Sequence, residues 1–119
     1  MRLLIAAVGR LKDGPEREIY ARYAERVRAA GKGSSLGPLD LVEVPEGRAG
    51  SADARKADEA ERLLAKAKDA GFRVVLDERG TRLTSRQLAQ SVRAARDRGV
   101  ACAAFLIGGP DGHGAGVAQ

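Results

Sequence analysis

Residues 100–114 read Val-Ala-Cys-Ala-Ala-Phe-Leu-Ile-Gly-Gly-Pro-Asp-Gly-His-Gly, an apolar run that passes directly into a glycine-rich segment. A run without polar alternation is typical of a parallel strand that helices cover on both faces. Ligands of open parallel sheets bind beyond the carboxyl ends of the strands, and glycines there let the backbone approach a ligand closely. We therefore predict a strand over residues 100–107 and a candidate ligand loop over residues 108–114.

Strand and helix signals alternate along the rest of the 119-residue chain, without a repeat. Gly14-Pro15 opens the first expected helix and Gly31 ends it, and Thr84 with Gln87 forms a capping box at the start of the last one. Helices between buried strands predict an α/β fold, a parallel sheet with right-handed helical crossovers. The expected strands cover about 3–8, 39–44, 72–76 and 100–107, and the expected helices about 15–30, 52–70 and 85–98.

Apolar spacing predicts which helix faces lie against the sheet. In the first helix the spaced residues are Ile19, Tyr23, Val27 and Ala30. In the second they are Ala57, Ala60, Leu64 and Ala67, with an Asp58–Arg62 ion pair on the solvent side. The strand over residues 72–76 is expected to be short and buried.

Composition fits one globular domain with a core of small side chains. Hydrophobic residues make up 44%, charged residues 31% and aromatic residues only 3%, so the core must be built from Ala, Val, Leu and Ile. Cys102 is the only cysteine; it excludes an intrachain disulfide, and the cytosol is the natural compartment. No segment reaches the length of a membrane span. The net charge of +5 fits RNA as a partner and equally fits an ordinary solvated surface.

The local sequence patterns indicate few candidate catalytic or metal-binding side chains. Asp77 and Glu78 follow the third strand and could act as acid or base, or be solvated or paired with Arg79. His113, the sole histidine, has no orienting group nearby in sequence, which favours a loop residue over a general base. No Cys or His pair has metal-ligand spacing. The glycine segment matches neither a Walker A loop nor a dinucleotide fingerprint, so the pattern alone favours a turn without a ligand.

Several segments together resemble the RlmH-type ribosomal RNA methyltransferases of the SPOUT class, and the resemblance covers essentially the whole chain. The most specific segment is Phe105–Gly112. The others, in order, are Leu4–Lys12, Tyr20–Tyr23, Val42–Pro45, the basic loop that follows it, Glu61–Leu64, Val75–Gly80 and Leu83–Ser85.

This resemblance implies a SPOUT (alpha/beta knot) fold and a homodimeric enzyme. The enzyme would use S-adenosylmethionine to methylate N3 of a pseudouridine in 23S rRNA of the assembled ribosome. Carried over residue by residue, it implies cofactor contacts at Leu76, Gly108 and Gly109. The catalytic residues stay unknown. The implied chemistry would need little from acid or base side chains, because the sulfonium is a strong methyl donor and the enzyme mainly has to hold the target nitrogen in line with it.

The sequence departs from the family pattern after the glycine loop. Relatives continue with a helix, a further cofactor loop and a helix with a His-Pro-Tyr-His-like tail, whereas this sequence stops at Gly114–Gln119. We therefore expect a single domain over residues 1–119 that is truncated at its C-terminus, with an incomplete knot, a compromised dimer face, very weak cofactor binding and no methyl transfer. Two alternatives stay open: a non-catalytic RNA- or ribosome-binding domain, and an unrelated nucleotide-binding module.

Overall fold

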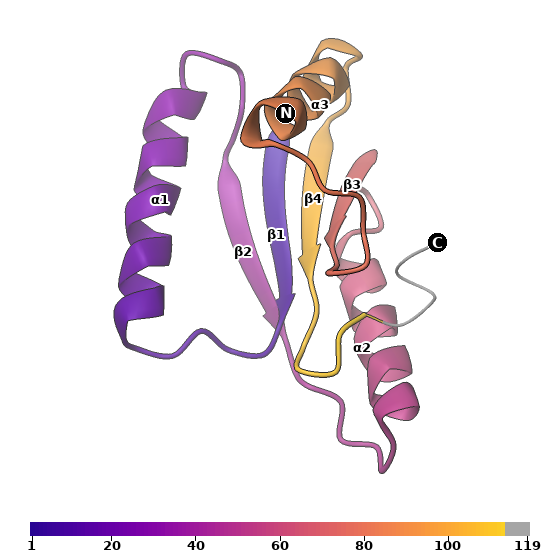
Figure 1. Ribbon diagram of the computed structural model, residues 1–119. Helices are drawn as coiled ribbons and strands as arrows, with labels where there is room; N and C mark the ends of the chain where they lie inside the picture. The colour runs from indigo at the N-terminus through magenta and orange to yellow at the C-terminus, as the bar shows by residue number, and fades with distance from the viewer. Residues whose placement is uncertain (114–119) are drawn as a thin grey trace.

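A computed structural model of the protein describes residues 1–113, which form a four-stranded, all-parallel sheet with three helices (Figure 1). The strand order is β2-β1-β4-β3, so the predicted parallel α/β fold is confirmed. The elements are β1 (Arg2–Val8), α1 (Pro15–Gly31), β2 (Leu39–Val44), α2 (Ala52–Lys66), β3 (Phe72–Leu76), α3 (Ser85–Asp97) and β4 (Cys102–Ile107). None of the helices in this described part is long and apolar enough to cross a membrane.

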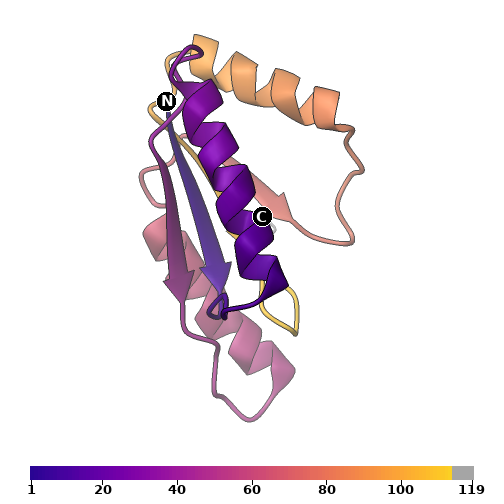
Figure 2. The ribbon, with the colours of Figure 1, turned by 90° about the vertical axis from the view of Figure 1, so that its left-hand side faces the viewer.

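The connections place the helices on both faces of the sheet. The chain moves from β1 outward to β2, crosses back over the sheet to β3 and returns to β4. Because crossovers are right-handed, steps in opposite directions along the sheet put their helices on opposite faces. Figures 1 and 2 accordingly show α1 and α3 on one side and α2 on the other. Arg96 of α3 donates a hydrogen bond to the carbonyl oxygen of Ser34, just beyond α1, at 2.8 Å.

Small aliphatic side chains fill both interfaces, as the composition predicted. Half of the buried hydrophobic side chains are alanines, and Ala6, Ala103, Ala104 and Leu106 of the two central strands have no exposed surface. Leu63 and Ala67 pack against one face of the sheet, and Ala24 packs against the other. Cys102, in β4, is also buried and is 6% exposed.

The prediction of which face of α1 packs against the sheet is wrong. Ile19, Tyr23 and Val27 are exposed, Tyr23 by 57%, whereas Ala24 and the partly buried Tyr20 meet the sheet. Both sets share the helical period, so spacing alone does not give the phase, and the small Ala24 allows closer approach. Gly31 ends α1 as predicted, and its place also reflects crowding, because a Cβ there would lie 2.0 Å from the carbonyl oxygen of Leu36.

The predicted face of the second helix is largely confirmed, but the helix ends at Lys66 rather than near residue 70. Ala60 and Ala67 are buried and Leu64 packs against the core, as predicted, whereas Ala57 is exposed and Leu63 is the most deeply buried side chain of the helix. The predicted Asp58–Arg62 ion pair does not form. Arg62 instead donates a hydrogen bond to the carbonyl oxygen of Pro45 at 2.9 Å, which ties α2 to the chain leaving β2.

The third strand is an edge strand, not a buried one. It has a single neighbour, β4, and Leu76 at its carboxyl end is half-exposed. The fourth strand starts at Cys102, two residues later than expected. The predicted capping box is confirmed: the Thr84 side chain accepts from the Gln87 N–H at 3.1 Å, and the Gln87 side chain accepts from the Thr84 N–H at 2.8 Å.

A pair of leucines tests how much stability the sheet–α2 interface supplies. Leu63→Ala removes a side chain that is 1% exposed and should lower the free energy of unfolding by about 2–5 kcal/mol. Leu83→Ala removes the same atoms from a side chain that is 53% exposed and should change it by less than about 0.5 kcal/mol. Urea unfolding followed by circular dichroism measures both, and equal losses would contradict this core.

Candidate functional site

A groove of about 430 Å³ lies at the carboxyl ends of β3 and β4. Its walls are residues 76–79 after β3, residues 107–113 after β4, and Lys56 of α2. In the parallel ladder Leu76 pairs with Ile107, so both strands end at the same level. The volume falls within the range of about 300–1,000 Å³ that is common for small-molecule sites.

The three residues predicted to contact a cofactor, Leu76, Gly108 and Gly109, all line this one groove. Leu76 contributes a half-exposed apolar side chain, and the glycines contribute backbone without side chains. Residues far apart in the sequence thus form two adjacent walls.

The glycines are also required by the packing of the loop itself. A Cβ on Gly109 would lie 2.9 Å from Val8 Cγ1, and one on Gly108 would lie 3.1 Å from the carbonyl carbon of Gly112. Gly112 has φ +83° and donates a backbone hydrogen bond to Gly109 at 2.9 Å. The loop is therefore a tight turn built against β1.

His113 closes the loop onto β3. Its side chain is 5% exposed, and its Nε2 lies 3.1 Å from the carbonyl oxygen of Leu76. It is a loop residue, as predicted, but it does have an orienting group. The sequence did not reveal that group because it is a backbone carbonyl 37 residues earlier in the chain.

Asp77 is held by Arg79, one of the arrangements that the sequence left open. Its Oδ1 accepts the Arg79 backbone N–H at 3.0 Å and lies 3.6 Å from Arg79 Nε. The backbone hydrogen bond and then the guanidinium charge hold the pKa of Asp77 below its usual value. Asp77 is therefore a carboxylate at neutral pH and a poor proton donor.

An ion pair that the sequence did not reveal fixes the other end of the loop. Arg55 of α2 reaches Asp111 with Nε–Oδ2 at 2.8 Å and Nη2–Oδ1 at 3.3 Å. The hydrogen bond and the charge of Arg55 lower the pKa of Asp111, and Asp111 in turn raises the pKa of Arg55. The pairing spans 56 residues, which no local pattern marks.

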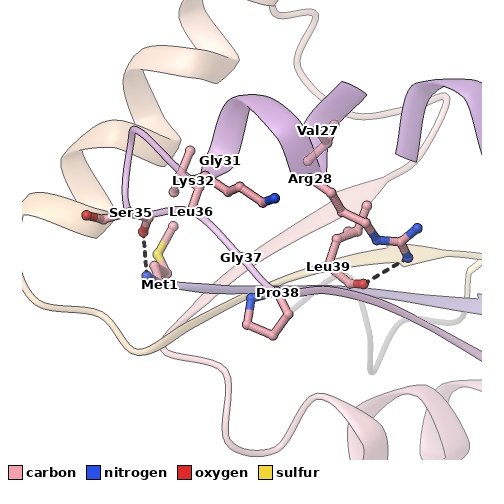
Figure 3. A pocket seen from close by; sticks show the side chains of 10 residues that line it. All are labelled: Met1, Val27, Arg28, Gly31, Lys32, Ser35, Leu36, Gly37, Pro38 and Leu39. Atoms are coloured by element: carbon pink, nitrogen blue, oxygen red, sulfur yellow. Dashed lines mark hydrogen bonds between the residues drawn. The ribbon is translucent and has the colours of Figure 1, made fainter. Parts of the chain in front are cut away.

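A second cavity, of about 500 Å³, lies near the amino ends of β1 and β2 (Figure 3). Its walls include the aliphatic side chains of Val27, Leu36 and Leu39. Its polar contacts join parts of the chain to each other: the Met1 ammonium donates to the carbonyl oxygen of Ser35 at 2.7 Å, and Arg28 donates to that of Leu39 at 3.2 Å. Although this cavity is larger, the carboxyl-edge groove is the better candidate site, because parallel sheets bind ligands there.

The parallel sheet and its carboxyl-edge groove define an α/β protein with a candidate small-molecule site beside its sheet. A family model described as "Predicted SPOUT methyltransferase" matches residues 1–119. Ribosomal RNA large subunit methyltransferase H of Xanthobacter autotrophicus is 46% identical over 112 residues, covering 94% of this chain and 70% of the relative. The protein of the same name from Afipia carboxidovorans is 44% identical over 119 residues, covering 100% and 74%.

The chain therefore belongs to the SPOUT methyltransferase family, and its relatives make it an RlmH-type enzyme of that family. The predicted family and the predicted methyltransferase class are both confirmed.

The Arg55–Asp111 pair predicts a specific dependence of stability on pH. Because folding lowers the pKa of Asp111 from 3.8, its contribution is complete above that value and is lost as the pH falls through the lower folded value. Asp111→Asn should be less stable than the wild type at pH 7, and the gap in the free energy of unfolding should shrink as the pH falls below 3.8 toward the lower folded pKa. Urea unfolding between pH 7 and pH 2.5 measures the difference; a gap that stays constant to the acid end would contradict the ion pair.

Proposed function

We propose that this protein transfers a methyl group from S-adenosylmethionine to N3 of a pseudouridine in 23S rRNA of the large ribosomal subunit. The supporting observation is that Leu76, Gly108 and Gly109 line one groove at the carboxyl edge of the sheet. The relatives' shared name, Ribosomal RNA large subunit methyltransferase H, supports RNA as the substrate class.

The groove has the chemistry that this cofactor needs. The exposed side of Leu76 offers an apolar surface to a nucleoside, and Gly108 and Gly109 offer backbone polar groups without side chains. Asp77 and Glu78 provide negative charge for a sulfonium and an ammonium group, and Lys56 provides positive charge for a carboxylate; all three line the groove. When bound, the cofactor would supply an activated methyl group on sulfur.

The chain's own contribution would be positioning rather than acid–base catalysis. Asp77 is held as a carboxylate by Arg79, Asp111 is paired with Arg55, and His113 is bonded to the Leu76 carbonyl. These groups hold the walls of the groove in place. A fixed groove would accelerate the reaction by holding the target nitrogen in line with the methyl group.

The remaining partner hypotheses come from the resemblance. The net charge of +5 and the exposed Arg48 and Arg79 suit contact with RNA phosphates. A homodimer stays a prediction, and so does a compromised dimer face. The expected incomplete knot, very weak cofactor binding and absence of methyl transfer concern the chain from residue 114 onward, outside the described residues. We propose transfer against the last of these expectations, because the relatives are named as methyltransferases.

Two matched glycine variants test the methyl-donor site. Gly108→Ala should weaken S-adenosylmethionine binding roughly tenfold, because its Cβ would lie 3.1–3.3 Å from Gly112 and His113. Gly33→Ala, where a Cβ meets nothing within 4 Å, should leave the affinity unchanged. Isothermal titration calorimetry measures both, and wild-type protein that binds ATP but not S-adenosylmethionine would favour the unrelated nucleotide-binding module.

Transfer to RNA is tested with ribosomes and S-adenosylmethionine carrying a labelled methyl group. We expect label in 23S rRNA at N3 of a pseudouridine, located by nuclease digestion and mass spectrometry. Arg48→Ala should weaken ribosome binding and lower its salt dependence by about one charge. Salt-sensitive ribosome binding without any transfer would support the non-catalytic RNA-binding alternative.

A further inference from the structure

Two residues of α2, one helical turn apart, hold the segments that surround the groove. Arg55 donates two hydrogen bonds to the carboxylate of Asp111 in the glycine loop. It also donates a hydrogen bond from Nη1 to the carbonyl oxygen of Ala49 at 3.1 Å. Such a fork fixes the direction as well as the distance of a carboxylate. The glycine loop is thereby joined through one guanidinium to the segment that precedes α2.

Glu59 makes the second attachment. Its side chain is buried, with 3% of the residue exposed, and its Oε2 accepts the Gly47 N–H at 2.8 Å. Gly47 lies so close to α2 that a Cβ there would be 2.7 Å from the carbonyl oxygen of Arg55. Glu59 and Arg55 thus fix the chain that leaves β2 as well as the chain that leaves β4.

The other oxygen of Glu59 lies beneath the glycine loop. Oε1 is buried and has no hydrogen-bond partner among the described residues, and a Cβ on Gly109 would lie 3.1 Å from it. A buried carboxyl oxygen without a donor is costly, but an apolar side chain here would leave the Gly47 N–H without its acceptor. No N–H of the loop donates to Oε1 among the described residues, so this oxygen acts on the loop through its polarity and its close packing under Gly109.

Neither side chain belongs to the groove wall. Lys56, between them in the sequence, lines the groove, but Arg55 and Glu59 do not. An effect of these two residues on a ligand would therefore pass through the segments that they hold.

We propose that Arg55 and Glu59 are positioning residues for the methyl-donor site. Arg55 fixes the glycine loop at Asp111, Glu59 supports the loop from beneath Gly109, and together they determine the affinity for S-adenosylmethionine without touching it. This inference rests on the proposed function.

A double-mutant cycle tests the role of Arg55. Arg55→Ala and Asp111→Asn should each weaken S-adenosylmethionine binding about tenfold by calorimetry. The double variant should be no weaker than the weaker single variant, because both changes remove one interaction. Arg55→Lys keeps the charge but loses the fork and should fall between wild type and Arg55→Ala. Arg93→Ala, an exposed arginine of α3, is the control and should bind as the wild type does.

Glu59→Gln tests the polarity beneath the loop while keeping the side-chain shape. The Gln oxygen can still accept the Gly47 N–H, and the amide NH₂ then replaces Oε1 with a donor. We expect weaker S-adenosylmethionine binding with an unchanged circular dichroism spectrum. Wild-type affinity in Glu59→Gln would overturn the role assigned to Glu59.

Amide hydrogen exchange of residues 108–113 without ligand separates this inference from the proposed function. Exchange should be faster in Arg55→Ala and Asp111→Asn than in the wild type and in Arg93→Ala. If the loop responds in this way but the wild type gives no heat with S-adenosylmethionine, the methyl-donor assignment fails and the attachment of the loop stands. Unchanged exchange in Arg55→Ala, or faster exchange with unchanged affinity, would overturn the positioning role.

Discussion

The pairing of β4 between β1 and β3 is the constraint on which the rest of the structure depends. Ala7 of β1 and Leu76 of β3 both pair with Ile107, so three strands end at one level and the chain beyond β4 turns back against its neighbours. A central strand covered by helices on both faces needs small side chains, and Ala103 and Ala104 of β4 are completely buried. Larger side chains at these positions would hold the helices away from the sheet.

The charged groups around the groove mostly bind one another or the backbone. Arg79 holds Asp77, Arg55 holds Asp111, and Glu59 holds the amide of Gly47. Side chains engaged in this way are poorly suited to exchanging protons with a substrate but well suited to fixing a backbone. A reaction whose donor is already activated needs little more than such a fixed backbone.

Sequence reasoning predicted the elements better than their faces or their contacts. Residues 39–44 and 72–76 were correctly bounded because Pro45 and Gly71 mark their ends locally. The phase of α1 was wrong because the stripe through Ile19 and the stripe through Tyr20 share one period, and the choice between them depends on how closely the sheet approaches. The groove could be located from the sheet rule and the resemblance. The side chains that hold the groove, such as Arg55 and Asp111, could not be paired from the sequence, because they lie 56 residues apart and meet only in the folded chain.

Because Cys102 is a buried free thiol, its chemical reactivity reports on local opening of the structure. It is the only thiol in the chain, and it pairs with Arg2 across the β1–β4 ladder while its carbonyl accepts the Gly71 N–H. Its side chain belongs to the cluster that packs beneath α2, at the amino end of β4, so a reagent in the solvent reaches the sulfur when this cluster opens. The rate of its alkylation therefore measures how often the packing between α2 and the sheet is lost at that end of the molecule.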